Sequence, residues 1–139
     1  MVDARPRVLE FEVSVDRDRV ARSGLGGGQL LREESWSAEH LVLAGLVRCT
    51  LASLDHAAER AQVRVAGAGR AHGTITKRED DGLYAFVDVE SDLDVELDPL
   101  PEREALEELL GRAERGCFVG NSLTARPRYR WTVNGREIA

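Results

Sequence analysis

The feature that most constrains this chain is a long helix that is apolar on every side. Residues 37–61 predict this helix, with Ser37 as its N-cap and Glu39 in its first turn. From Leu41 to Leu54, apolar side chains cover nearly its whole circumference. Such a helix belongs in the centre of a structure. Because one sheet cannot cover it in a chain of 139 residues, we expect a second copy to cover the far side in an isologous dimer.

Length and composition predict one domain over residues 1–139. Apolar residues make up 42%, which is enough for one core, and the net charge of −6 disfavours nucleic acid as the main partner. The N-terminus lacks the apolar segment of a secretory signal, and the longest apolar run, at residues 41–47, is far short of a membrane span. We therefore expect a cytoplasmic location and no association with a membrane.

Alternation of apolar and polar residues predicts strands on both sides of the helix. A glycine-rich turn at residues 24–28 follows the first strand, and a bend at Gly67–Gly69 is expected to divide residues 62–78 into two strands. Gly73 is expected to mark a bulge. The expected strands lie at residues 7–15, 29–32, 62–78, 83–97 and 128–133. The side chains expected on the core face of 83–97 are Leu83, Ala85, Val87, Val89, Leu93, Val95 and Leu97.

A second, amphipathic helix is expected between Pro99 and Gly116, with proline at its first position. Its apolar stripe consists of Leu106, Leu109, Leu110 and Ala113. Cys117 follows almost in line with this stripe, so it is expected to enter the core. The order of elements predicts an α+β fold, in which a strongly curved antiparallel sheet packs on the long central helix and on the second helix.

The chain has two cysteines, and each is delivered by a helix. Cys49 lies in the middle of the apolar helix, and Cys117 lies just past the end of the second helix. A reducing cytosol argues against a permanent structural disulfide. Two interpretations stay open at this point. The cysteines are either small buried hydrophobes or a reactive thiol together with a thiol that resolves it.

A reactive cysteine needs a lowered pKa, and burial alone raises it, so a cation is expected near Cys49. Arg48 points about 100° away around the helix, which leaves Arg22 and Arg32 as candidates. Glu39 is suited to orient such an arginine through a charge-assisted hydrogen bond. However, Glu39 is about 15 Å from Cys49 along a straight helix. It is therefore expected to act on the Cys49 of a partner subunit, or else to serve only as an acidic residue at a helix N-terminus.

Other kinds of site have little support in the sequence. His40 and His56 lie too far from Cys49 along the helix to share a metal ion with it, and no CxxC, HxH or HExxH spacing occurs. The Asp and Glu residues of 83–97 would splay along a strand instead of converging on calcium. Residues 24–31 lack the lysine of a phosphate-binding loop. We expect no metal and no cofactor.

Two segments carry a resemblance to a known family. Residues 37–49, S-A-E-H-L-V-L-A-G-L-V-R-C, resemble the S-P-E-x-L-L-L-A-A-x-x-x-C helix of the OsmC/Ohr family, the osmotically inducible and organic hydroperoxide resistance proteins. Residues 117–123, C-F-V-G-N-S-L, are similar to the second motif of that family, C-x-V-x-x-x-L. The resemblance covers essentially the whole chain and is clearest from Ser35 to Trp131.

The resemblance implies an intertwined homodimer with shared sites and a thiol-dependent peroxidase activity on small hydroperoxides. It implies that Cys49 forms a sulfenic acid, that Cys117 resolves it as a disulfide, and that a dithiol such as a lipoyl group reduces the disulfide. The family glutamate corresponds to Glu39. Gln29 stands where the hydroperoxide branch has an arginine after paired glycines, and Phe118 stands where it has a proline, so the closer resemblance is to general OsmC-like proteins. The alternatives are a non-catalytic dimer that binds a small apolar or thiol-bearing molecule between its subunits, and a stable dimer whose cysteines only pack.

Overall fold

The computed structural model describes residues 6–138. The chain divides into two compact units, Met1–Ser37 and Ala38–Ala139, and each is described by itself. The single domain expected over residues 1–139 stays a prediction.

The first unit contains a short hairpin of β1 (Val13–Val15) and β2 (Ala21–Ser23), which pair in antiparallel fashion. The strand expected over 7–15 is therefore shortened to three residues, and the strand expected over 29–32 is reduced to one bridge between Leu30 and Ala21. The apolar side chains of β1 are exposed. An isolated two-stranded hairpin is only marginally stable, which explains why the alternating pattern gives so short a strand here.

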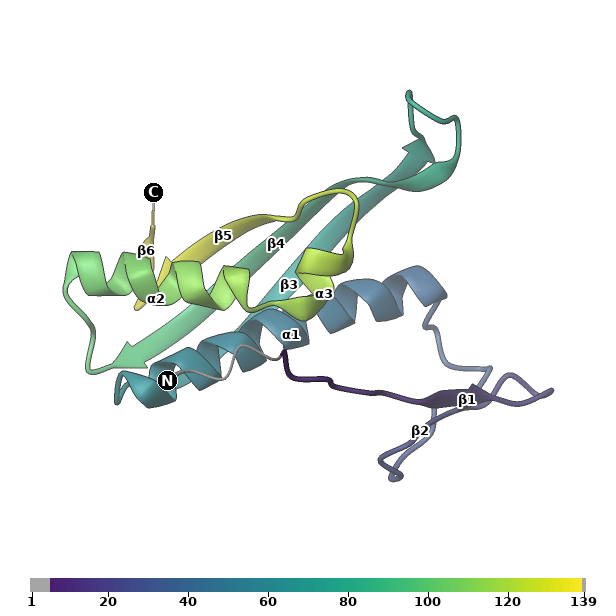
Figure 1. Cartoon of the computed structure of the whole chain (residues 1–139), viewed down its shortest axis with the longest axis horizontal. Coiled ribbons are helices and arrows are strands. Elements are labelled where there is room, and N and C mark those ends of the chain that lie inside the picture. The colour runs from purple at the N-terminus through teal and green to yellow at the C-terminus, as the bar shows by residue number, and fades with distance from the viewer. Residues whose placement is uncertain (1–5, 139) are drawn as a thin grey trace. The chain divides into compact units, whose positions relative to one another are not determined.

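The second unit carries a four-stranded sheet in the order β3-β4-β5-β6 with its helices on one face (Figure 1). Its elements are α1 (Ala38–Arg60), β3 (Arg64–Lys77), β4 (Tyr84–Asp98), α2 (Arg103–Arg115), α3 (Phe118–Ser122), β5 (Arg128–Val133) and β6 (Arg136–Glu137). The helix expected over residues 37–61 is confirmed as α1. The segment after Asn134-Gly135 returns along β5 as β6, a strand that the sequence did not predict.

The sheet is mixed, which corrects one part of the expected architecture. The α+β class is confirmed, and β3 pairs with β4 in antiparallel fashion as expected. In contrast, β4 and β5 run parallel, from the pair Glu90–Arg128 to the pair Val95–Val133. Parallel neighbours need a long crossover connection, and α2 and α3 supply it. The two intervening helices bring the chain back beside Glu90 of β4, so β5 runs in the same direction as β4.

The strand β3 is continuous, whereas two strands around a bend at Gly67–Gly69 were expected. Glycine is needed at position 67 for space and not for a bend, because a Cβ atom there would lie 2.6 Å from the carbonyl oxygen of Asp94. The glycine thus allows β3 and β4 to approach closely. The expected bulge at Gly73 is displaced slightly, since the register shifts between Thr74 and Ile75.

The extra residue at this shift is Val87 of β4, since Thr74 pairs with Asp88 and Ile75 pairs with Phe86. A bulge reverses which side chains face the core. The expected core face is therefore correct after the bulge, where the buried side chains are Val89, Leu93, Val95 and Leu97. It is wrong before the bulge, where Val87 and Leu83 are exposed and Phe86 packs inward.

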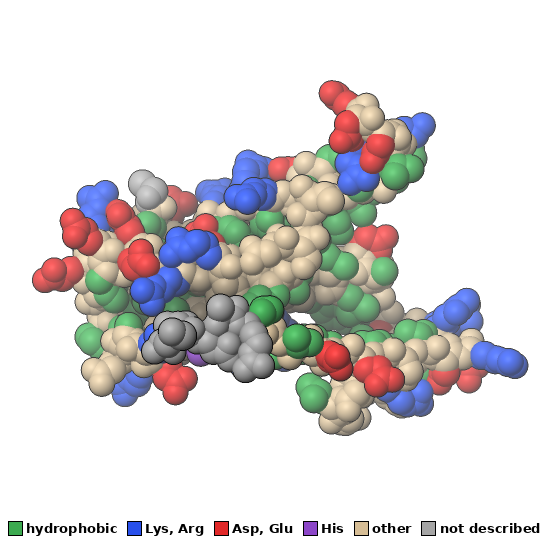
Figure 2. All heavy atoms as spheres, viewed as in Figure 1, with side chains coloured by type: hydrophobic (Ala, Val, Ile, Leu, Met, Phe, Trp, Pro, Cys, Tyr) green, Lys and Arg blue, Asp and Glu red, His purple; other side chains and the backbone are tan. Residues whose placement is uncertain are grey.

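The second helix begins later than its prolines suggested, at Arg103 with Glu102 as N-cap. The expected apolar stripe of α2 is confirmed, and Gly116 ends the helix. Charged side chains cover the outward face of α2 and the tip of the β3–β4 hairpin (Figure 2). The main core lies between the stripe of α2, the second half of α1 and the inner face of the sheet, where Leu54, Leu93 and Trp131 meet.

The helix α1 is only partly covered within one chain. Leu46 and Leu54 are fully buried, but Leu41 and Val42 are 40% and 36% exposed. The sheet and α2 cover one side of this helix, which agrees with the expectation that a single chain does not cover it all round. Contrary to our expectation, α1 is long and apolar enough to cross a membrane by length and composition, a test that the core helix of a soluble protein also passes. The dimer that would cover its far side stays a prediction.

Candidate functional site

The two cysteines meet in a small apolar cluster beside the main core. Cys117 is fully buried together with Leu46 and Val89, and Cys49 is partly exposed and packs against the same cluster. Cys49 comes from the middle of α1, and Cys117 comes from the short connection between α2 and α3. Gly116 ends α2 just before Cys117, so the chain turns there and carries the sulfur inward.

Polar groups surround the sulfur of Cys117 even though it is buried. The Thr50 hydroxyl lies 3.2 Å from this sulfur, and the backbone N–H of Gly120 donates to it at 3.4 Å. The Leu46 carbonyl lies 3.8 Å away and accepts from the thiol. Cys117 is also the N-cap residue of α3. This sulfur therefore lies in a site with hydrogen-bond partners, unlike a cysteine that only fills space.

The sulfur of Cys49 is influenced by the same segment of the chain. Burial raises the pKa of the Cys49 thiol above its usual range, and the neighbouring Cys117 thiol raises it further. The backbone N–H groups of Val119 and Phe118 act in the opposite direction and lower this pKa, since they stabilise a thiolate. Among the described residues, no cation is one of the strongest influences on Cys49. In a single chain, its thiol is therefore the favoured form at neutral pH.

Tyr129 is a site residue that our sequence reasoning missed. Its hydroxyl lies beside the Cys117 sulfur, because both are next to the position that a Cβ atom of Gly120 would take, and its ring packs against the cluster that contains Cys117. Burial raises the pKa of the phenol. Gly120 leaves room for this hydroxyl, because a Cβ atom at that position would overlap it. The alternation of residues 128–133 puts Tyr129 on the same face as Trp131. However, nothing in a strand pattern indicates which buried residue a tyrosine contacts.

The residues that were predicted to activate Cys49 lie in two different parts of the chain. Arg22 belongs to the first unit, where it forms an ion pair with Asp16 at 2.9 Å, and Arg32 lies in the same unit. Glu39 is exposed in the first turn of α1, and the continuous helix separates it from Cys49 of its own chain by about 15 Å. The roles of Arg22, Arg32 and Glu39 toward Cys49 stay predictions.

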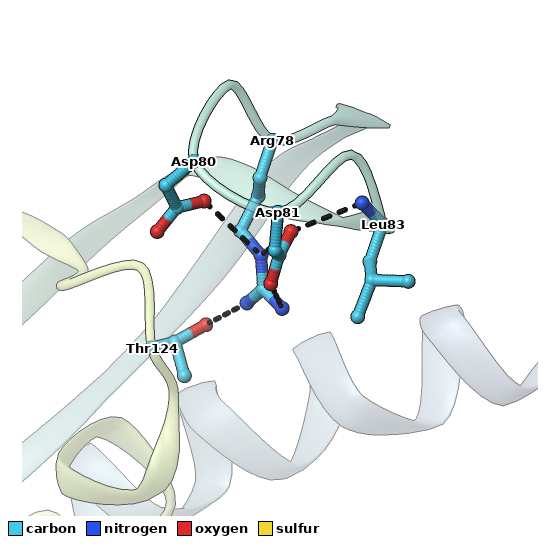
Figure 3. Close-up of polar contacts among 5 residues, drawn as sticks. All are labelled: Arg78, Asp80, Asp81, Leu83 and Thr124. Carbon is cyan, nitrogen blue, oxygen red and sulfur yellow. Dashed lines mark hydrogen bonds and ion pairs between the residues drawn. The ribbon is translucent and has the colours of Figure 1, made fainter.

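A further arginine, Arg78, lies in the turn between β3 and β4 (Figure 3). Its guanidinium donates two hydrogen bonds to the Asp81 carboxylate at 3.1 and 2.7 Å and one to the Thr124 hydroxyl at 3.1 Å. Asp80 approaches the same guanidinium to 4.0 Å. Two aspartates therefore balance its charge. The bond to Thr124 joins the hairpin to the segment between α3 and β5, so Arg78 is an anchor for the segment that follows Cys117.

Metal ligands do not gather in the part of the chain that the structure describes. Within residues 6–138, no group of three His, Cys, Asp or Glu side chains is placed to hold a metal ion. The acidic side chains of β4 instead face arginines along the outer face of the sheet. Arg128, for example, contacts Asp88 at 2.7 Å and Glu90 at 2.8 Å.

Comparison with known proteins establishes the family. The family described as "OsmC-like protein" matches residues 31–132, which is most of the chain and includes both cysteine motifs. This chain belongs to the OsmC-like protein family. The resemblance of the two cysteine motifs to the OsmC/Ohr proteins is thereby confirmed. No curated protein sequence matches the chain.

Solved structures of this family share the fold. An OsmC-like protein of unknown function from Vibrio cholerae is 16% identical with a TM-score of 0.74, covering 90% of this chain and all of that one. The organic hydroperoxide resistance protein OhrB of Bacillus subtilis is 18% identical with a TM-score of 0.57, over 90% and 96% of the two chains. A putative organic hydroperoxide resistance protein from Vibrio cholerae, with captopril bound in one of its active sites, is 17% identical with a TM-score of 0.65, over 98% and 99%.

Proposed function

We propose that this protein is a thiol-dependent peroxidase that reduces small organic hydroperoxides. The Cys49 thiolate attacks the O–O bond, takes one oxygen as a sulfenic acid and releases the alcohol after protonation. The Cys117 thiol then attacks the sulfur of the sulfenic acid, which forms a disulfide and releases water. A dithiol, for which a lipoyl group is our candidate, reduces the disulfide and becomes a cyclic disulfide itself.

One observation carries this proposal, namely the meeting of a partly exposed Cys49 with a fully buried Cys117. A peroxidatic thiol must be reached by its substrate, whereas a resolving thiol needs only to reach the first sulfur. The N–H groups of Phe118 and Val119 add support, since they favour a thiolate at Cys49. The names of the structural relatives that are hydroperoxide resistance proteins point to the same activity.

The raised pKa of Cys49 means that the proposal needs a cation from outside the single Ala38–Ala139 unit. We propose that Arg22, or Arg32 in its place, supplies this charge and that Glu39 of a partner subunit orients it. A homodimer with shared sites would also cover the exposed side chains of Leu41 and Val42 on α1. We further propose a cytoplasmic location, where reduced thiols are maintained.

The dimer has a direct test on α1. The mass of the parent protein by light scattering is expected to be that of two chains. Leu41→Glu, which places a charge on the exposed apolar side of α1, is expected to give single chains. Ala105→Glu is the control, because it places the same charge on the exposed face of α2. A parent protein that is monomeric at micromolar concentration would contradict the shared site.

The peroxidase activity is tested by counting thiols. One equivalent of tert-butyl hydroperoxide is expected to remove both thiols of the parent together, and to produce a sulfenic acid at Cys49 in Cys117→Ser that dimedone traps. The control is Cys49→Ser, in which Cys117 should stay reduced because it is buried. A Cys49→Ser protein that consumes the hydroperoxide as fast as the parent would overturn the proposal. Arg22→Ala and Arg32→Ala then identify the activating cation through the pH dependence of the first step.

One observation favours a second function, which is binding without catalysis. The Cys49 thiol is the favoured form in a single chain, and one structural relative carries captopril in an active site. A non-catalytic dimer that holds a small apolar or thiol-bearing molecule between its subunits fits both facts. It predicts saturable binding of such a molecule and no loss of thiols with one equivalent of hydroperoxide.

A further inference from the structure

The Cys117 sulfur lies where a negative charge would be costly without donors. Cys117 is fully buried, and so is Thr50 beside it. When Cys117 attacks Cys49, its sulfur must lose a proton or share it with a neighbour. A buried charge is stabilised only by groups that donate hydrogen bonds to it. The identity of those donors therefore controls how readily Cys117 acts.

Three groups that can donate a hydrogen bond lie beside this sulfur, but one of them has two acceptors. The Thr50 hydroxyl has a single proton, which it divides between the Leu46 carbonyl at 2.9 Å and the Cys117 sulfur at 3.2 Å. The Gly120 N–H contributes one hydrogen bond at 3.4 Å. The remaining group with a proton to give is the Tyr129 hydroxyl. A phenol with the usual pKa of about 10 is already protonated at neutral pH, and burial raises the pKa of Tyr129 further, so this phenol remains a donor.

We propose that Tyr129 is a positioning residue for the resolving step, and that its hydroxyl holds and stabilises the Cys117 sulfur as it attacks Cys49. The proposal rests on the proposed function and adds a residue outside the two cysteine motifs. In this step the electron pair of the Cys117 sulfur forms the S–S bond and the S–O bond of the Cys49 sulfenic acid breaks. The proton of Cys117 leaves with the hydroxide as water, so no further reactant is needed. Gly120 is part of the arrangement, because any larger residue would displace the Tyr129 hydroxyl.

The test uses Ellman's reagent, so that it does not depend on peroxide. The partly exposed Cys49 reacts first and forms a mixed disulfide with thionitrobenzoate. Cys117 then attacks the Cys49 sulfur and releases a second thionitrobenzoate, whose absorbance reports the closing of the disulfide. Tyr129→Phe is expected to leave the first release unchanged, to slow the second about tenfold and to raise its pH midpoint by about one unit, the effect of one hydrogen bond to a charged group.

The matched control is Tyr84→Phe, because the chain has two tyrosines and Tyr84 is 71% exposed. This variant is expected to close its disulfide like the parent. Gly120→Ala is expected to reproduce Tyr129→Phe by moving the hydroxyl away. Closing of Tyr129→Phe at the parent's rate, with an unchanged pH midpoint, would overturn the proposal.

A second measurement covers the case in which Tyr129→Phe does not fold. In the Tyr84→Phe protein, 3-fluorotyrosine is incorporated at the one remaining tyrosine, which makes the phenol a stronger donor with little change in packing. The pH midpoint of the second release is expected to fall, and an unchanged midpoint would contradict the role of the hydroxyl. Neither assay depends on whether the protein has peroxidase activity. If Cys49 forms no sulfenic acid while Tyr129 still governs closing, the peroxidase proposal fails and the positioning role stands.

Discussion

The Thr50 hydroxyl lies 3.2 Å from the Cys117 sulfur, although 67 positions separate the two residues in the chain. The same hydroxyl donates to the Leu46 carbonyl one turn earlier in α1. Thr50 thus joins the central helix to the segment that carries the second cysteine. Because Thr50 is fully buried, this contact contributes to stability as well as to the site.

Replacement of Thr50 by valine is expected to lower the free energy of unfolding by about 1 kcal/mol, the usual net worth of a buried hydrogen bond. The valine keeps the shape of the side chain but places a methyl group beside the Cys117 sulfur. Urea denaturation followed by circular dichroism measures the change. Thr76→Val, at an exposed position of β3, is the control and should leave the midpoint unchanged. Equal midpoints for the two variants would show that the Thr50 contact has no energetic role.

Asn134 extends the edge of β4 with its side chain. Its amide oxygen accepts from the Leu97 N–H at 2.8 Å, and its amide nitrogen donates to the Leu97 carbonyl at 3.1 Å. Its φ of 50° also favours asparagine or glycine. Asn134→Gly keeps the backbone conformation and loses both hydrogen bonds, so we expect a loss of about 2 kcal/mol. Asn134→Ala is expected to lose about 1 kcal/mol more, because it adds backbone strain. Thermal unfolding of both variants should rank them in that order, and the reverse order would refute this explanation.

The stability of the fold is expected to decrease at alkaline pH. Burial raises the pKa of both the Cys49 thiol and the Tyr129 phenol in the folded protein. The unfolded chain therefore loses these protons first, and stability falls as pH rises. The full contribution is present below about pH 8.5, the usual thiol pKa, and it is lost as pH passes the raised values. Urea midpoints at about pH 7.5 and about pH 10.5 should differ less in Tyr129→Phe than in Tyr84→Phe, and equal differences would contradict the assignment to Tyr129.

Gly67→Ala is expected to destabilise the β3–β4 hairpin by about 1 to 3 kcal/mol. The new Cβ would lie 2.6 Å from the carbonyl oxygen of Asp94 and 2.8 Å from the Cα of Val95. Both are backbone atoms of β4, which is paired with β3 on one side and with β5 on the other, so neither atom can move away without disturbing the sheet. Gly28→Ala is the control, because a Cβ there meets nothing within 4 Å. Chemical denaturation that gives the same midpoint for both variants would show that the strands adjust freely.

Local patterns predicted most of the elements of the second unit. The stripe of Leu106, Leu109 and Leu110 was sufficient to place α2 and its buried face. The alternation of β4 was correct from Val89 onward and wrong before it. Its failure has one cause, the extra residue at Val87, which reverses the faces without leaving a mark in the hydrophobic pattern.

The amino-acid sequence by itself determined the type and order of α1, β4, α2 and β5, the entry of Cys117 into the core and the family, because these depend on periodicity and on residue spacing along the chain. Tertiary structure alone decided that β5 runs parallel to β4 and that Thr50 and Tyr129 surround the sulfur of Cys117. Such contacts join segments far apart in the chain. No local pattern encodes them, since the position of each side chain depends on how the helices and the sheet pack together.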